Sequence, residues 1–354
     1  MRKVPLRVVT TDPNHRRLNG LLISTSMSPK ILILDPHAET YRDRLHVEFP
    51  ALQFALAHKA PELPSDLSDI DVLISFGIEL KDDFYQRATR LKWMQCLATG
   101  VDHVMRCPSL KPETLLTSGR GIHGAPMRET IVFLMMGVAR EARRLAEAQK
   151  AHLWDRRLWS LFRGKTAVIV GVGVIGIATA KLLKAFEMHV IGLTRTPRIT
   201  EGFDEIMPTD RIEAAAARAD YLINILPATK DNLLLFDAAV FVAMKPSAYY
   251  ISAGRGQTVD EAALVEALRT RRIAGAGLDV FQTEPLPADS PFWDLPNAFI
   301  LPHLGGYTSE YEDLIMPLII ANMRLFLAGR LSEMQNIVRH CSYGALPLVD
   351  FRER

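Results

Sequence analysis

Short apolar runs alternate with longer polar and apolar mixtures along the first third of the chain. Residues 31–35, 71–75 and 92–97 are apolar over the length of a buried strand. Residues 38–49 and 81–89, which separate them, are expected to be helical. Strands separated by helical segments form βαβ units with a parallel sheet. A further short strand is expected at 115–118, before a glycine-bearing turn. The pattern therefore predicts an α/β unit in this region.

The same alternation predicts a second α/β unit further along the chain. Its strands are expected at 167–171, 189–193, 221–226, 248–252, 276–280 and 297–301. A helix over 310–328 then returns apolar residues to the first unit. Between the units, Pro126 precedes one long helix over 128–150, whose first half is apolar on nearly all sides and is therefore expected to be buried. We place the domain boundary at this helix.

A glycine-rich turn joins the first strand of the second unit to a helix. Gly171 permits a tight turn, Gly173 lets the backbone approach a pyrophosphate, and Gly176 lets the helix pack close to the sheet. The free N–H groups at the helix start face the anion. In this strand–turn–helix context the motif favours dinucleotide binding over a purely structural turn. The expected cofactor contacts are Gly171, Gly173, Val174, Ile175 and Gly176.

The segment after the next strand indicates which dinucleotide binds. An NAD-binding protein usually carries Asp or Glu there to bind the ribose hydroxyls, but nothing acidic occurs between Met188 and Thr200. The segment instead offers Thr194 and Arg195, which suit a 2′-phosphate. The sequence favours NADP, with NAD as the alternative because some NAD proteins also lack the acid.

Three ionisable residues, Arg255, Glu284 and His303, each follow a predicted strand of the second unit. An arginine between glycines can approach a ligand and grip a carboxylate with two hydrogen bonds. A carboxylate paired with His303 would hold one tautomer of the ring and make it a proton donor or acceptor near neutral pH. Taken singly, a surface arginine and a structural histidine are the simpler interpretations.

A glycine-bearing loop also follows a strand of the first unit. Thr99, Gly100 and Val101 lie where backbone N–H groups at the carboxyl end of a parallel strand can bind an anion. An ordinary turn is an equally good interpretation of the loop by itself.

Composition narrows the class of protein. A chain of 354 residues is long enough for two domains. A net charge of +2 does not indicate the basic surface of a nucleic-acid-binding protein. The longest uncharged run, 166–180, is too short to span a bilayer. Three unpaired-looking cysteines indicate reduced thiols in a cytoplasmic protein. No His, Cys and acidic residues have metal-ligand spacing, so no metal is expected.

The first 30 residues carry six basic side chains and a single acidic one. They lack the apolar core of a secretory signal. A disordered extension is the first interpretation, and a transit peptide is the alternative. Translation from Met27, just before the first strand, would remove most of the segment. Residues 341–354 are expected to form a C-terminal tail.

From residue 31 to about 338 the chain resembles the D-isomer-specific 2-hydroxyacid dehydrogenases. The resemblance rests on GVGVIG, ISAGRGQTVDEAAL, GLDVFQTEPLP and LPHLGG, in that order. CLATGVD and SGRGIHGAPMRE are most similar to the branch acting on glyoxylate, hydroxypyruvate and related 2-keto acids. The fold implied has two Rossmann-like or flavodoxin-like domains with parallel sheets and a cleft between them. Residues 31–126 with 304–340 would bind the substrate, and 127–303 the dinucleotide.

The resemblance also implies roles for individual residues. A small 2-keto acid would be reduced to the D-2-hydroxy acid with NAD(P)H, His303 acting as acid/base, Glu284 as its partner and Arg255 binding the substrate. The substrate carboxylate would meet the backbone amides of Thr99, Gly100 and Val101. Further cofactor contacts would be Leu226, Pro227, Asn232, Ala253 and Asp279, the last to the nicotinamide amide. The apolar helix from Ile131 and the resemblance both predict a homodimer.

Other members of the family define the alternatives. Some are NAD(H)-sensing corepressors that retain the trio, although this chain has no basic patch or added interaction domain. Others act on formate, phosphite or phosphoglycerate, and a phosphorylated substrate would need more cations near Thr99. The chain departs from the family at Ser252, commonly Asn, at Glu187, usually a glycine after the fingerprint helix, and at Arg128, usually a small residue.

Overall fold

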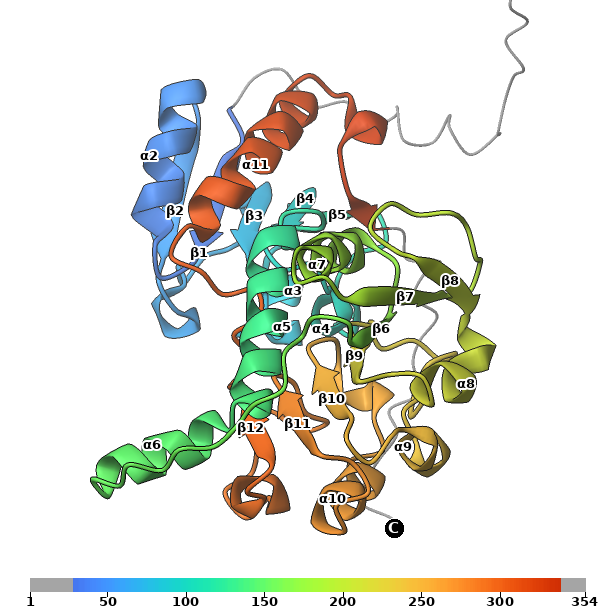
Figure 1. The fold of residues 1–354 in the computed structure, drawn as a ribbon. Coiled ribbons are helices and arrows are strands. Elements are labelled where there is room, and N and C mark those ends of the chain that lie inside the picture. The colour runs from blue at the N-terminus through green and yellow to red at the C-terminus, as the bar shows by residue number, and fades with distance from the viewer. Residues whose placement is uncertain (1–27, 339–354) are drawn as a thin grey trace, which may run out of the picture. The chain divides into compact units, whose positions relative to one another are not determined.

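The computed structural model describes residues 28–338. The expectations for an N-terminal extension, a start at Met27 and a C-terminal tail concern residues outside this range, apart from the last few of the extension. Within the range the chain forms two compact units, residues 28–120 with 310–338 and residues 121–309. Each is built around one mainly parallel sheet, so the predicted α/β class is confirmed (Figure 1).

The first unit has a six-stranded sheet. Its strands are β1 (Lys30–Leu34), β2 (Gln53–Ala57), β3 (Val72–Ser75), β4 (Trp93–Cys96), β5 (Leu115–Thr117) and β13 (Ile337–Val338). Its helices are α2 (Ala38–Glu48), α3 (Asp82–Arg87), α4 (Asp102–Met105) and α11 (Tyr311–Leu327). The order β13-β5-β4-β3-β1-β2 is flavodoxin-like, with β13 added antiparallel to β5 at one edge.

The second unit has a seven-stranded parallel sheet. Its strands are β6 (Thr166–Val170), β7 (His189–Thr194), β8 (Glu205–Pro208), β9 (Tyr221–Asn224), β10 (Tyr249–Ser252), β11 (Gly275–Leu278) and β12 (Ala298–Ile300). Its helices are α5 (Gly124–Ala139), α6 (Ala142–Lys150), α7 (Val174–Ala185), α8 (Ile212–Ala216), α9 (Ala238–Ala243) and α10 (Glu261–Arg269). The order β12-β11-β10-β9-β6-β7-β8 is that of a Rossmann sheet with one additional strand, β12. Short 3₁₀ helices in the two units cover Ala60–Glu62, Thr209–Arg211, Gly256–Thr258, Pro291–Asp294 and Leu331–Glu333.

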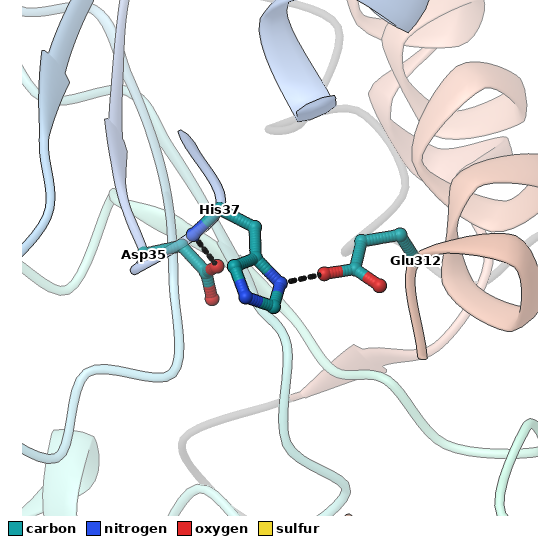
Figure 2. Close-up of side chains that lie close together, drawn as sticks. All are labelled: Asp35, His37 and Glu312. Atoms are coloured by element: carbon teal, nitrogen blue, oxygen red, sulfur yellow. Dashed lines mark hydrogen bonds and ion pairs between the residues drawn. The ribbon is translucent and has the colours of Figure 1, made fainter. Parts of the chain in front are cut away.

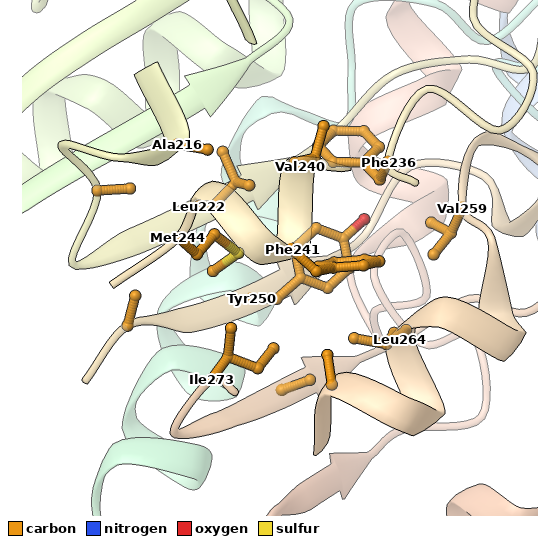
Figure 3. Close-up of a cluster of buried hydrophobic side chains, with 14 of the residues drawn as sticks. Ala216, Leu222, Phe236, Val240, Phe241, Met244, Tyr250, Val259, Leu264 and Ile273 are labelled. Atoms are coloured by element: carbon orange, nitrogen blue, oxygen red, sulfur yellow. The ribbon is translucent and has the colours of Figure 1, made fainter. Parts of the chain in front are cut away.

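Helices cover both faces of the second sheet. Along β6, Val168 and Val170 join a core with α8, α9 and α10, while Ala167 and Ile169 join a core with α5 and α7. In the first of these cores Tyr250 packs edge-on against Phe241, with ring centroids 5.3 Å apart (Figure 3). Because both faces are buried, the strands read as continuous apolar runs in the sequence.

The predicted single helix over 128–150 is wrong. The structure has two helices, α5 and α6, with a break at Arg140 and Glu141. Glu141 takes a left-handed backbone conformation with φ of 52°, which ends the first helix. The break falls where the apolar pattern gives way to a polar one, and α6 has no buried residue. In Figure 1, α6 extends away from the sheet of its own unit.

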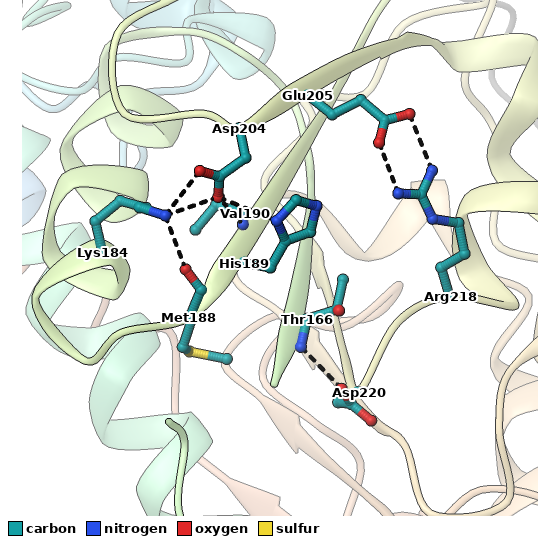
Figure 4. A network of polar contacts seen from close by, with 9 residues as sticks. All are labelled: Thr166, Lys184, Met188, His189, Val190, Asp204, Glu205, Arg218 and Asp220. Atoms are coloured by element: carbon teal, nitrogen blue, oxygen red, sulfur yellow. Dashed lines mark hydrogen bonds and ion pairs between the residues drawn. The ribbon is translucent and has the colours of Figure 1, made fainter. Parts of the chain in front are cut away.

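Acidic residues satisfy backbone donors at the amino ends of the second sheet's strands. Asp204 accepts hydrogen bonds from the Val190 amide at 2.7 Å and the Lys184 ammonium at 2.8 Å (Figure 4). Asp220 accepts one from the Thr166 amide at 2.8 Å. Ligands of such sheets bind at the opposite, carboxyl ends of the strands. We therefore assign these acidic residues a structural role.

Glu187, which stands where the resembled family usually has glycine, lies at the end of α7. The Met188 amide donates to the Leu183 carbonyl at 3.2 Å and the Glu187 amide to the Lys184 carbonyl at 3.0 Å. This pair of bonds is a Schellman motif, whose left-handed residue is usually glycine. Here Glu187 takes that conformation with φ of 57°. Its backbone is strained, because Cβ comes too close to the following carbonyl oxygen.

Glu187→Gly is expected to raise the free energy of unfolding by about 0.5–1 kcal/mol, because removal of Cβ relieves the left-handed strain. The ion pair lost with Arg163 is exposed and contributes little. Urea titration measures the change. Glu187→Ala loses the same ion pair but keeps Cβ, so equal unfolding free energies for the Gly and Ala variants would contradict the strain.

Within residues 28–338, no helix combines the length and the apolar character needed to span a bilayer.

Candidate active site

The glycine turn after β6 has the shape of a pyrophosphate cradle. Gly171 has φ of +121°, a conformation that favours glycine. A Cβ on Gly176 would lie 2.1 Å from the Gly171 carbonyl oxygen, so α7 can begin this close only without a side chain. At Gly173 a Cβ would meet no heavy atom within 4 Å, which leaves the backbone open to a ligand. The turn fits a dinucleotide at the start of α7, where Val174 and Ile175 supply amides of the first turn.

The other expected cofactor residues lie at the ends of neighbouring strands. Thr194 ends β7, and the exposed Arg195 that follows it forms an ion pair with Asp231 at 3.0 Å. Asn232 accepts the Thr229 amide at 2.7 Å and so shapes its own loop. Leu226 and Pro227 follow β9, and Ala253 follows β10. All of them lie on the edge that carries the glycine turn.

His303 and Glu284 form a hydrogen-bonded pair beyond β12 and β11. His303 Nδ1 lies 2.7 Å from Glu284 Oε2, and both side chains remain partly exposed, at 45% and 34%. The backbone of His303 has φ of 54°, an uncommon conformation for a residue other than glycine. Strain of this kind persists where the surroundings fix it and is frequent at functional sites.

The electrostatics favour an ionised Glu284. Burial opposes ionisation, but hydrogen bonds from His303 and the Phe281 amide, with the charges of His303 and Arg255, hold the pKa of Glu284 below its ordinary value. The Phe281 amide donates to Glu284 Oε1 at 2.9 Å. Glu284 can therefore hold its partner as a charged acceptor, fixing the histidine's tautomer.

Asp279 anchors the backbone on which His303 sits. Its carboxylate accepts the amides of Leu304 at 2.7 Å and Gly305 at 3.0 Å, and its carbonyl accepts the amide of His303 at 2.9 Å. The side chain is only 1% exposed, and burial raises its pKa against the effect of the two amides. Sequence reasoning gave Asp279 a contact with the cofactor but did not predict this anchoring role.

Arg255 lies on a loop packed between two other strand ends. A Cβ on Gly254 would lie 2.5 Å from the Leu226 carbonyl oxygen, and one on Gly256 would lie 1.9 Å from the Phe281 carbonyl carbon. The two glycines therefore let the loop pack directly against both neighbouring backbones. Arg255 is half-buried and donates to the Gly254 carbonyl at 2.9 Å.

A buried polar network beneath Arg255 was not predicted. The side-chain amide of Asn224 donates from Nδ2 to Thr258 Oγ1 at 2.8 Å and to Ser252 Oγ at 3.3 Å. Thr258 in turn donates to the Arg255 carbonyl at 2.7 Å. All three polar side chains are at most 1% exposed. The available signal was a polar residue inside an apolar strand, namely Asn224 in β9 and Ser252 in β10.

The loop of Thr99, Gly100 and Val101 lies in the first unit, between β4 and α4. Val101 is buried and caps α4, where its carbonyl accepts the Met105 amide at 3.0 Å. Ahead of the loop, the Tyr311 hydroxyl donates to the Leu97 carbonyl at 2.6 Å. The loop thus starts from a fixed point of its own unit.

One group of side chains in the first unit could hold a metal ion. Ligand atoms of Asp35, His37 and Glu312 lie within 4.8 Å of one another (Figure 2). Sequence spacing did not reveal the group because Glu312 follows His37 by 275 positions. Asp35 accepts the His37 amide at 2.8 Å, and the ion pair with Glu312 raises the pKa of His37. These hydrogen bonds account for the arrangement, and we assign no metal to it.

Comparison with known proteins identifies the family. The model of the D-isomer-specific 2-hydroxyacid dehydrogenases, NAD-binding domain, matches residues 132–305. Glyoxylate/hydroxypyruvate reductase B from Pectobacterium carotovorum subsp. carotovorum is 32% identical over 317 residues, which cover 87% of this chain and 97% of that protein. The chain therefore belongs to the D-isomer-specific 2-hydroxyacid dehydrogenase family, as the four sequence motifs predict.

Solved structures agree with this assignment. A D-isomer-specific 2-hydroxyacid dehydrogenase family protein from Aeromonas salmonicida subsp. salmonicida superposes with a TM-score of 0.82 at 30% identity, covering 88% of this chain and 99% of that chain. An NADPH-dependent glyoxylate/hydroxypyruvate reductase from Sinorhizobium meliloti, in complex with NADP and sulfate, gives 0.76 at 29% identity, covering 89% and 99%. The predicted similarity to the glyoxylate/hydroxypyruvate reductase branch is confirmed.

Proposed function

We propose that this enzyme reduces a small 2-keto acid, such as glyoxylate or hydroxypyruvate, to the D-2-hydroxy acid with NADPH. The observation that carries the proposal is the 2.7 Å hydrogen bond between His303 Nδ1 and Glu284 Oε2, on the strand edge that also bears Arg255. The named activity of the reductase relatives supports the same reaction.

The chain's own residues supply the acid/base chemistry and the substrate contacts. The reduced nicotinamide, when bound, supplies a hydride for the carbonyl carbon. Glu284 engages Nδ1 of His303, so the ring gives its proton to the carbonyl oxygen from Nε2. The Arg255 guanidinium binds the substrate carboxylate and carbonyl and stabilises the negative charge that develops on the oxygen. In the reverse direction His303 accepts the proton of the hydroxy acid.

A kinetic panel tests the reaction itself. Glyoxylate, hydroxypyruvate and longer 2-keto acids are each supplied with NADPH and with NADH, and cofactor oxidation is followed by absorbance. We expect turnover with the small acids and a higher kcat/KM with NADPH. A purified protein that oxidises neither cofactor with any of these acids would overturn the proposal.

The domain roles follow from the same proposal. Residues 127–303 would bind the dinucleotide through the glycine turn and the neighbouring strand ends, and residues 31–126 with 304–340 would bind the substrate. The backbone amides of residues 99–101 are our proposed additional contact for the substrate carboxylate. The NADP complexes of two Sinorhizobium meliloti relatives support the choice of cofactor.

Arg195→Ala is expected to weaken NADPH binding about tenfold while leaving NADH binding within about twofold, because only NADPH carries the 2′-phosphate. Arg195 is 79% exposed and its partner Asp231 is 69% exposed, so a phosphate can replace that carboxylate. Titration of cofactor fluorescence measures both dissociation constants. Arg218→Ala is the control, since Arg218 is an exposed arginine paired with Glu205 at the opposite strand edge. Equal weakening of both cofactors would contradict the role.

We infer that the protein is a homodimer held by α5, α6 and the segment that follows. Large apolar side chains are exposed there, and exposed apolar patches of this kind mark protein–protein interfaces. They are Phe133, Met136, Leu153, Trp154, Leu158, Trp159 and Leu161. A second copy of the same chain is the partner that a closed two-fold dimer requires.

Replacing Trp154 and Leu158 together by glutamate is expected to convert the dimer to a monomer. These side chains are 90% and 101% exposed, so the change leaves the core of the protomer intact. Light scattering coupled to size-exclusion chromatography measures the mass. Val242→Glu, at an exposed apolar residue of α9, is the control that should keep the dimer. A monomeric wild-type protein would contradict the inference.

The thiols support a cytoplasmic location as a further part of the proposal. Cys96 and Cys107 are both free, and Cys96 is buried with its pKa raised to about 12 by burial. Unpaired thiols are usual in a reducing compartment.

A further inference from the structure

The turn that carries Glu284, residues 281–284, rests directly on the segment that carries Arg255. The contact is backbone to backbone, because Gly256 lies so close to Phe281 that a Cβ would be 1.9 Å from its carbonyl carbon. The Phe281 amide then donates to the Glu284 carboxylate at 2.9 Å. Any shift of this turn therefore moves the group that holds His303.

Gln282 is the point at which the turn is fastened. Its amide donates to Glu261 Oε1 at 2.7 Å, and its carbonyl accepts the side chain of Gln257 at 3.2 Å. Its own side chain donates to the Val259 carbonyl. All three partners lie in residues 257–261, just after Arg255. A single short segment thus holds both polar groups of the Gln282 peptide.

Glu261 is the charged member of this arrangement, and its position is electrostatically costly. It is the first residue of α10, where the helix dipole stabilises a negative charge. A glutamate that pointed into solvent would gain this stabilisation as well. Instead it is half-buried and faces Gln282. Burial raises the pKa of its carboxyl; the Gln282 amide acts against this shift, and the charge of Glu284 adds to it. The helix N-cap is supplied separately by Asp260, which accepts the Ala263 amide at 3.1 Å.

We propose that Glu261 is a positioning residue for the reaction: by accepting the Gln282 amide it fixes the 281–284 turn, and through that turn it fixes the Glu284 carboxylate that orients His303. This inference rests on the proposed reductase function. Glu261 touches neither the substrate nor the reacting atoms, so its contribution is to kcat through the geometry of the Glu284–His303 pair.

Two substitutions at this position separate the hydrogen bond from the charge. Glu261→Gln and Glu261→Ala both remove the negative charge at the start of α10, but only glutamine keeps an acceptor for the Gln282 amide. We expect Glu261→Ala to lower kcat about tenfold with the KM for NADPH unchanged, since small displacements of a catalytic group have effects of this size or larger. Glu261→Gln should stay within about twofold of wild type. Glu266→Ala, at an exposed glutamate of the same helix, is the control that leaves kcat unchanged.

Hydrogen exchange gives a readout that does not depend on turnover. We expect the Gln282 amide to exchange about tenfold faster in Glu261→Ala and at the wild-type rate in Glu261→Gln. Glu261→Met, which keeps the volume without an acceptor, replaces the alanine variant if that one does not fold. The proposal is overturned if kcat and exchange are unaffected in the variants without an acceptor, or if Glu261→Gln is as impaired as they are. An inactive wild-type protein would instead refute the reductase function, while the exchange rates would still decide whether Glu261 fastens the turn.

Discussion

Replacing His303 by alanine is expected to lower kcat for 2-keto acid reduction about a thousandfold, because the variant lacks the group that transfers the proton. The dissociation constant for NADPH should stay within about twofold of wild type. The side chain is 45% exposed and contacts Glu284, while the backbone is held separately through Asp279. The loss should therefore appear in the chemical step. Steady-state kinetics and cofactor titration measure the two quantities.

His189→Ala provides a matched control for this variant. His189 is also partly exposed and lies 3.4 Å from an acidic partner, Asp204, but at the amino end of its strand. Its removal should leave kcat unchanged. Turnover at the wild-type rate in His303→Ala would refute the acid/base role, and a matching loss of NADPH binding would indicate that His303 acts on the cofactor site instead.

Arg255→Lys is expected to lower kcat/KM for the keto acid about a hundredfold, and Arg255→Ala about a thousandfold. Lysine keeps the charge but replaces a planar fork of donors by a point charge, so the two parallel hydrogen bonds to a carboxylate are lost. The loop should remain in place, because Gly254, Gly256 and Thr258 fix its backbone. Kinetics with the keto acid varied at saturating NADPH measure the effect.

Arg218→Lys serves as the control for Arg255→Lys, since Arg218 pairs with Glu205 away from the site. A kcat/KM that is unchanged in Arg255→Lys would contradict bidentate binding by Arg255. If only Arg255→Ala lowered kcat/KM strongly, Arg255 would act through its charge and not through the geometry of its guanidinium.

The apolar pattern was sufficient to predict the α/β class and most of the strands. It missed β2, β8 and β13, which are partly exposed strands and therefore lack a continuous apolar run. It also merged α5 with α6, because the left-handed turn at Glu141 leaves no sequence signal such as glycine. An apolar pattern arises where side chains are buried, and the residues of these three strands are mostly only partly buried.

The position of the candidate site was predictable from the sequence to the level of strand ends. Residues that follow parallel strands meet at one edge, and this rule, with the family resemblance, selected Arg255, Glu284 and His303. The supporting contacts were not predictable. Asn224 reaches Thr258 across 34 positions and Glu261 reaches Gln282 across 21, and no local pattern encodes such pairs.

The backbone at His303 has a consequence for attempts to make the enzyme more heat-resistant. His303, with φ of 54°, has nearly the same left-handed backbone torsion as Glu187, with φ of 57°. Thermostability screens reward glycine or asparagine at both, because each relieves strain. At Glu187 that gain is without cost to the proposed reaction. At position 303 the proposed acid/base role predicts that the same gain selects an inactive protein, so screens of this enzyme need an activity measurement alongside the melting temperature.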